Sequence, residues 1–182
     1  MAIIIISDFL INNFLCSTVE DKLYLIDSLY NKKVYKEAFL EAQKLYNKNS
    51  QNVDVLCRMA GTSFIKAHNE KDSKKQIKYF YHGFEYAKEG LKLDSLHGYA
   101  NFWYAAYIGR IGEIEGIKQG ILNSYEVQKY CLKAIEIDPN YAGAHNNLGI
   151  VFKELGEFQK AINCFQKTIE IKPDYADAHV SL

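Results

Sequence analysis

The fold of this chain is decided by Ala134-Ile-Glu-Ile-Asp-Pro-Asn-Tyr-Ala-Gly-Ala-His145 and its near-copy Thr168-Ile-Glu-Ile-Lys-Pro-Asp-Tyr-Ala-Asp-Ala-His179. Each stretch contains one of the chain's only two prolines, Pro139 and Pro173, which lie 34 residues apart. A fixed period of this length indicates an array of stacked structural repeats. Such arrays mostly hold partners along an extended concave face, so the period favours binding over catalysis.

The composition is that of a folded, electrically balanced protein. Of the 182 residues, 48% are hydrophobic, and the 22 Lys and Arg residues equal the 22 Asp and Glu residues in number. Because a protein that grips a phosphate backbone usually has a basic excess, we do not expect nucleic acid as a partner. The four cysteines form no Cys-x-x-Cys motif, so we expect small buried residues, a reducing compartment and a cytoplasmic location.

The clearest repeat unit covers residues 142–175. Its first predicted helix has a single packing stripe, with intervals of three, four and seven residues, formed by His145, Leu148, Gly149 and Phe152. The glycine in this stripe would let a neighbouring helix approach closely. Its second helix alternates small and large residues at Ala161, Phe165 and Thr168. Pro173 should end that helix.

This pattern of small, large and turn residues resembles the tetratricopeptide repeat. The resemblance implies an all-α, right-handed superhelical solenoid of helix hairpins. Counting backwards from the best unit places repeats near 19–52, 53–97, 98–141 and 142–175, with a partial fifth at 176–182. The solenoid would then form a repeat domain over residues 19–182.

The two middle units are longer than the period of 34. The extra residues of the second unit fall in the polar stretch His68–Lys75, which predicts an exposed loop and a helix start. Those of the third unit fall within Gly109–Ser124, where glycines 112, 116 and 120 predict bends and a close approach of two helices. In the first unit, Leu25 and Leu29 are expected to face the core, after a capping box formed by Ser17 and Glu20.

The two ends of the chain are harder to assign to repeats. Residues 1–18 are apolar but lack the basic start of a signal peptide, and they are shorter than the roughly 20 residues that span a bilayer. We expect an arm or capping element there, with a membrane-surface anchor as the alternative. At the other end, a solenoid normally closes with a polar capping helix. Residues 176–182 are too few to form one, which leaves truncation, a covering partner or self-association as alternatives.

The middle of the chain has a second, finer resemblance. The segments Asn101-Phe-Trp-Tyr-Ala-Ala106 and Gly112-Glu-Ile-Glu-Gly-Ile-Lys118, then Ser124 and Lys133-Ala-Ile135, are similar to the regulator of microtubule dynamics family. The similarity is clearest over residues 80–140, whereas residues 142–175 look closer to an ordinary tetratricopeptide repeat. The resemblance implies a non-catalytic adaptor linked to the cytoskeleton or to organelle surfaces.

The candidate binding site is the concave groove of the second to fourth units. The first-helix positions that face away from the packing stripe supply its predicted partner-binding residues: Tyr99, Phe102, Ala106, Arg110, Asn146, Ile150 and Lys153. Apolar anchors of a peptide would enter the groove while its polar groups pair with the polar members of this set. In the alternative, the N-terminal arm or the long helices fill the groove and make Tyr99 and Phe102 ordinary core. Trp103 is also expected in the core.

No constellation typical of catalysis, metal binding or cofactor binding was found in the sequence. His145 and His179 recur at the repeat period, which favours a packing role. We therefore predict a non-catalytic scaffold or adaptor that binds a protein or peptide. The alternative is a carrier that holds a lipid or another apolar small molecule between the long middle helices, or a contact protein for organelles or the cytoskeleton.

Overall fold

The computed structural model describes residues 18–181, and every regular element in that range is a helix. The helices are α2 (Val19–Asn31), α3 (Tyr35–Tyr46), α4 (Val53–His68), α5 (Ser73–Leu93), α6 (Gly98–Glu115), α7 (Ile117–Ile137), α8 (Ala142–Glu154), α9 (Phe158–Ile171) and α10 (Ala176–Ser181). The predicted all-α tetratricopeptide-like solenoid is thereby confirmed. The predicted N-terminal arm lies outside the described residues, apart from Thr18.

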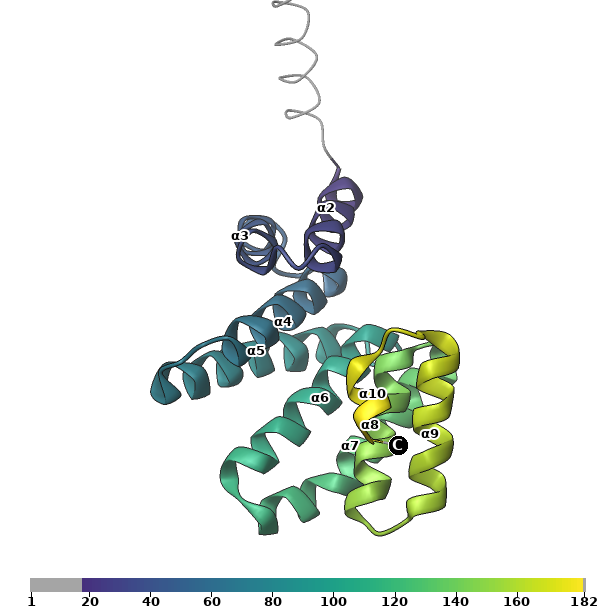
Figure 1. Cartoon of the computed structure of the whole chain (residues 1–182). Helices are drawn as coiled ribbons and strands as arrows, with labels where there is room; N and C mark the ends of the chain where they lie inside the picture. Colours follow the sequence, from purple (N-terminus) through teal and green to yellow (C-terminus); the bar gives the residue numbers. More distant parts are fainter. Residues whose placement is uncertain (1–17, 182) are drawn as a thin grey trace, which may run out of the picture.

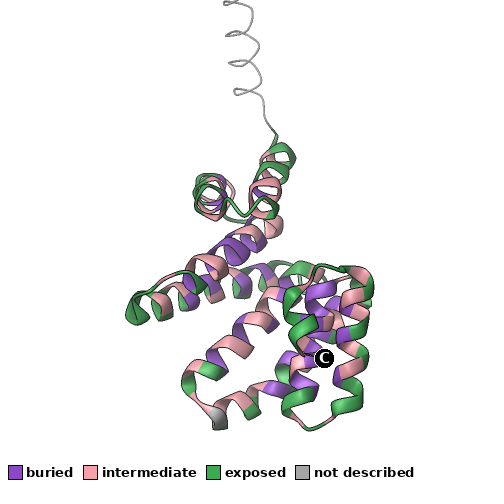
Figure 2. Ribbon diagram, viewed as in Figure 1, coloured by how far each residue is buried: buried purple, intermediate pink, exposed green. Residues whose placement is uncertain are grey.

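The helices form consecutive pairs that stack side by side along a curved row (Figure 1). Each helix packs on its partner in the pair, and α4, α6 and α8 also contact one another in succession. The first helices of the pairs therefore share one face of the row. In Figure 2, α4 is buried along most of its length, since it contacts α2, α3, α5 and α6.

The middle pairs are longer than the last complete pair. Helices α5 and α7 have 21 residues each, whereas α8 and α9 have 13 and 14. The turn between α6 and α7 consists of Gly116, whose φ of 103° favours glycine. A Cβ on Gly112 would lie 3.0 Å from the Cα of Gly120, which confirms the predicted close approach. No helix in the described range combines the length and apolar character that a bilayer-spanning segment requires.

The first helix begins one residue later than the sequence suggested. Thr18, not Ser17, is the N-cap of α2, and its hydroxyl accepts a hydrogen bond of 3.1 Å from the Asp21 backbone N–H. The Asp21 carboxylate accepts the Thr18 N–H at 2.9 Å and completes the capping box. The predicted inward position of Leu25 is wrong as well, because Leu25 is 45% exposed while Ile26 is buried.

Large aromatic side chains pack where the facing helix has a glycine. Tyr107 of α6 is fully buried over Gly83 of α5, and its hydroxyl donates a 2.8 Å hydrogen bond to the Ala60 carbonyl of α4. Likewise, a Cβ on Gly149 would lie 2.6 Å from the ring of Phe165. Gly149 thus permits the close approach that the sequence predicted.

The recurrent histidines have a different role from the one expected. Nε2 of His145 lies 3.0 Å from the carbonyl oxygen of Pro139, and Nε2 of His179 lies 2.7 Å from that of Pro173. Both hydrogen bonds hold the turn that precedes a first helix. The two histidines thus fix the same turn geometry in successive repeats.

The glycine under Tyr107 provides a stability test. Gly83→Ala would place a methyl group onto the Tyr107 hydroxyl, so we expect the free energy of unfolding to fall by about 1–3 kcal/mol. Gly109→Ala is the matched control, since its Cβ would meet Val127 at an ordinary 3.7 Å and alanine favours the helix. Urea denaturation measures both. Equal stability of the two variants would contradict the packing described here.

Candidate partner-binding cavity

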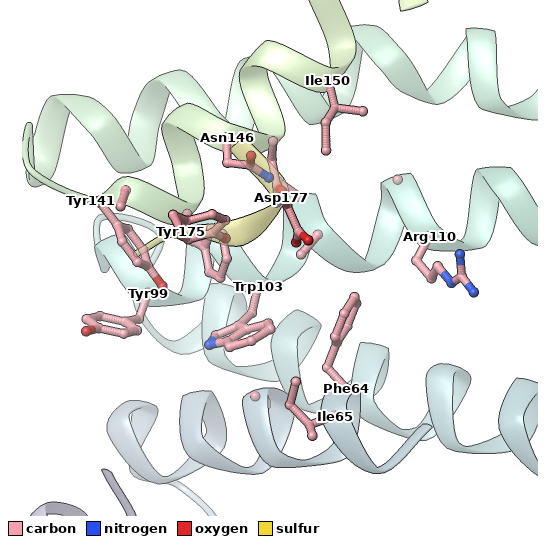
Figure 3. Close-up of a pocket in the computed structure, with 18 of the residues that line it drawn as sticks. Phe64, Ile65, Tyr99, Trp103, Arg110, Tyr141, Asn146, Ile150, Tyr175 and Asp177 are labelled. Atoms are coloured by element: carbon pink, nitrogen blue, oxygen red, sulfur yellow. The ribbon is translucent and has the colours of Figure 1, made fainter. Parts of the chain in front are cut away.

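A cavity of about 910 Å³ lies on the face that the first helices share (Figure 3). Residues of α2, α4, α6 and α8 line it, together with the inner side of α7 and the turn leading into α10. Its size is within the range of sites that bury a small ligand or several side chains of a peptide.

Six of the seven predicted partner-binding residues line this cavity: Tyr99, Phe102, Ala106, Arg110, Asn146 and Ile150. Lys153 is exposed and is not among the lining residues. Ile150 and its neighbour one helical turn later, Glu154, both face the cavity. One residue along a helix turns the side chain by about 100°, so Lys153 is directed away from the wall that Glu154 faces.

Five rings form an aromatic wall: Phe64, Tyr99, Phe102, Trp103 and Tyr141. Their centroids are 5.7 Å apart for Phe64 and Trp103, 4.8 Å for Phe102 and Trp103, and 4.6 Å for Phe102 and Tyr141. Phe102 is only 9% exposed and behaves as core, whereas Tyr99 is 46% exposed. Trp103 is half-buried and lines the cavity, so it is not the purely core residue that the sequence suggested.

The cavity has more acidic than basic side chains. Its acids are Asp27, Glu113, Asp138, Glu154 and Asp177, and its permanently charged bases are Arg58, Arg110 and Lys172. This excess favours a ligand with positive charge.

Arg58 is already neutralised within the chain. Its guanidinium donates hydrogen bonds of 3.1 and 2.7 Å to Asp27 and one of 2.8 Å to Asp54. Burial acts to lower the pKa of Arg58, but the hydrogen bond and charge of Asp27 outweigh burial, and the pKa is raised. The same guanidinium lies 5.5 Å from the ring centroid of Tyr99 and so supports the aromatic wall.

Asn146 and Arg110 each contribute to the cavity a buried polar atom without a hydrogen-bond partner among the described residues. The side chain of Asn146 is 3% exposed, and the atom concerned is its Oδ1. A buried acceptor in this state costs about 1–3 kcal/mol. A ligand that donates an N–H to this oxygen would remove that cost.

The thiol that lines the cavity is not a nucleophile. Burial raises the pKa of Cys57 to about 12, so the thiol stays protonated at neutral pH. Its sulfur lies 3.8 Å from Nδ1 of His97. Within residues 18–181, no three His, Cys, Asp or Glu side chains gather in a way that could hold a metal ion.

The turns contribute residues that the sequence analysis did not select. Tyr141 and Tyr175 both precede a first helix, lie 34 residues apart and line the cavity. Asp177 of α10 lines it as well. The recurrence of tyrosine before alanine was visible in the sequence, but only the curvature of the row shows that these turns reach the cavity.

Comparison with protein families gave two matches. The model described as regulator of microtubule dynamics protein 1-3 matches residues 23–153, a longer stretch than the one on which the resemblance was clearest. The tetratricopeptide repeat model matches residues 142–175, in agreement with the ordinary character predicted for the last unit.

Curated relatives agree with the longer match. Regulator of microtubule dynamics protein 1 of Mus musculus is 33% identical over 153 residues, which cover 79% of this chain and 48% of the relative. The protein of the same name in Bos taurus is 33% identical over 71% of this chain and 43% of its own length. The chain thus spans less than half the length of these relatives.

Solved structures agree on the fold. A thermophilic tetratricopeptide repeat protein of Thermus thermophilus aligns with a TM-score of 0.69 at 10% identity, covering 90% of this chain and 79% of its own. MamA aligns with a TM-score of 0.53 at 24% identity, covering 86% of this chain and 79% of its own. At these identities the likeness concerns the fold alone.

The pKa of Glu154 provides a test of the cavity's electrostatics. Burial and, secondarily, the charge of Glu113 raise this pKa, so Glu113→Gln should lower it toward the ordinary value of about 4.3 without abolishing the whole elevation. Because folding raises the pKa, the protonated form stabilises the fold below the unfolded-state pKa, and this contribution is lost as pH rises through the folded-state pKa.

A carbon NMR titration of the Glu154 carboxyl group measures this effect. The control is Glu126→Gln, an exposed position of α7 outside the cavity lining. If Glu113→Gln left the Glu154 pKa unchanged, the charge of Glu113 would not contribute to the raised pKa of Glu154.

Proposed function

The chain belongs to the regulator of microtubule dynamics family, and on that premise we propose that it is a non-catalytic scaffold that binds a segment of a partner protein in the concave cavity. The fold supports this proposal, because tetratricopeptide arrays present extended concave surfaces to partners. The observation that carries it is the buried, unpartnered Oδ1 of Asn146 inside an aromatic-walled cavity.

The proposed contacts follow the chemistry of the lining. Apolar side chains of the segment would pack on Tyr99 and Ile150, with Ala106 leaving room between them. An N–H group of the segment would donate to Asn146, and its acceptors would reach Arg110, whose Nε is buried without a partner among residues 18–181. Lys153 would act at the exposed edge, outside the cavity lining.

The family name suggests a setting for this scaffold. The curated relatives are named as regulators of microtubule dynamics. We propose that this chain is the adaptor part of such a protein and connects its partner to the cytoskeleton. A reducing compartment such as the cytoplasm fits the free thiols of Cys57, Cys131 and Cys164.

A matched pair of lysine substitutions tests the location of binding. Ile150→Lys places a charge in the cavity and should reduce partner capture at least about tenfold, through the desolvation of that charge. Leu122→Lys makes the same chemical change on α7, at a residue that is 60% exposed and outside the cavity lining, and should leave capture unchanged. Quantitative mass spectrometry after pull-down compares both with the original chain, and circular dichroism checks helicity.

Two outcomes would contradict the proposal. If Ile150→Lys and Leu122→Lys captured the partner equally well, the partner would bind outside the cavity. A lipid that co-purifies with the original chain in native mass spectrometry, and is lost with Ile150→Lys, would indicate a carrier instead of a scaffold.

A further inference from the structure

Resting on the proposed function, we infer that the cavity recognises an arginine side chain of the partner segment, held between the Trp103 indole and the Asp177 carboxylate. The partner is therefore a protein segment with a basic residue rather than a purely apolar or acidic one. The inference combines three independent observations: the position of the acidic group, the state of the aromatic wall and the unsatisfied acceptor of Asn146.

The close-up shows the opposing walls of this subsite (Figure 3). Asp177 extends from α10 into the cavity, and Asn146 of α8 lies on the same wall. Trp103 and Phe64 form the opposite, aromatic wall, with ring centroids 5.7 Å apart. A flat cationic group that entered between these walls would meet oxygen acceptors on one side and π-electrons on the other.

The subsite contains an acidic group without an ion-pair partner among residues 18–181, whereas the two arginines of the cavity are paired. Arg58 is paired with Asp27 and Asp54, and Arg110 is paired with Glu113. Asp177 has no ion pair with any residue in the described part of the chain, although it faces a cavity with an acidic excess. The remaining cation of the lining, Lys172, lies over the Tyr175 ring, 5.8 Å from its centroid, so an incoming cation would find the Asp177 carboxylate available.

In the aromatic wall, the ring of Trp103 has no cation from the described part of the chain over it. The chain's own cations lie over other rings, with Arg58 5.5 Å from the Tyr99 centroid and Arg110 5.2 Å from the Phe80 centroid. None of the cation–π pairs among residues 18–181 involves Trp103, although tryptophan is the side chain that binds cations best in this way. The indole face that lines the cavity is therefore available to a cation from outside.

The unpartnered acceptor of Asn146 favours a ligand that donates hydrogen bonds at this point. Its Oδ1 is buried and unpartnered, and the Asp177 carboxylate can only accept when ionised. Arginine has five N–H donors in a planar group that stacks on aromatic rings and binds carboxylates through two bonds. Lysine has a compact ammonium that cannot stack, so it should bind less tightly.

The single tryptophan of the chain makes the test direct. The indole N–H of Trp103 gives the only such NMR signal, and its shift can be followed as N-acetyl-arginine amide is added. We expect saturable binding with a Kd on the order of 1–10 mM, which is ordinary for so small a probe. N-acetyl-citrulline amide, which has the same shape without the charge, should bind at least about tenfold more weakly, and N-acetyl-lysine amide about threefold more weakly.

A pair of aspartate variants locates the site. Asp177→Asn should weaken the arginine probe about five- to tenfold, because it removes the charge of the carboxylate. Asp174→Asn changes an exposed acid in the turn that precedes α10, outside the cavity lining, and should leave the Kd unchanged. Amide spectra of both variants report whether the fold is retained.

Several results would overturn the inference. They are a Trp103 signal that does not shift, equal binding of citrulline and arginine, or no effect of Asp177→Asn. A shift with phosphocholine in place of arginine would indicate a lipid headgroup instead. If these probes fail while partner capture remains sensitive to Ile150→Lys, the proposed scaffold function stands and only the arginine subsite is rejected.

Discussion

The structure depends on one packing constraint: the rings of α6 insert where neighbouring helices have glycine. Phe102 packs on Gly143 of α8, Trp103 on Gly61 of α4, and Tyr107 on Gly83 of α5, each closer than a Cβ would allow. One helix thus determines the positions of three others, because interiors tolerate little added volume. The curvature of the row, and with it the concave cavity, follows from these contacts.

The same rings connect stability to the proposed function. Tyr107 is fully buried and donates its hydroxyl to Ala60, so it serves the fold alone. Trp103, four residues earlier on α6, has one edge against Gly61 while it also lines the cavity. The binding surface is therefore held by the core of the solenoid. Such a preorganised surface loses less conformational entropy when a partner binds.

The periodicity of the sequence was enough to predict the fold, whereas the sequence predicted only some of the residues that line the cavity. The helix pairs were predicted from the spacing of Pro139 and Pro173 and from the small residues on each packing stripe. Packing against a neighbouring helix requires small residues at this spacing, so the pattern is visible in the sequence. The shift of the cap from Ser17 to Thr18 depended on local backbone geometry that two adjacent hydroxyl residues do not distinguish. Asp177 reaches the cavity only because the row curves, and a single sequence contains no measure of that curvature.

Hydrogen exchange of the chain, alone and with its captured partner, tests the central claim most directly, because it reports which helices the partner covers. The account predicts slower exchange for amides of α4, α6 and α8, the first helices that line the cavity, with little change in α3, α5 and α9. Protection confined to α3, α5 and α9 would contradict the account, since the partner would then bind the outer face of the solenoid.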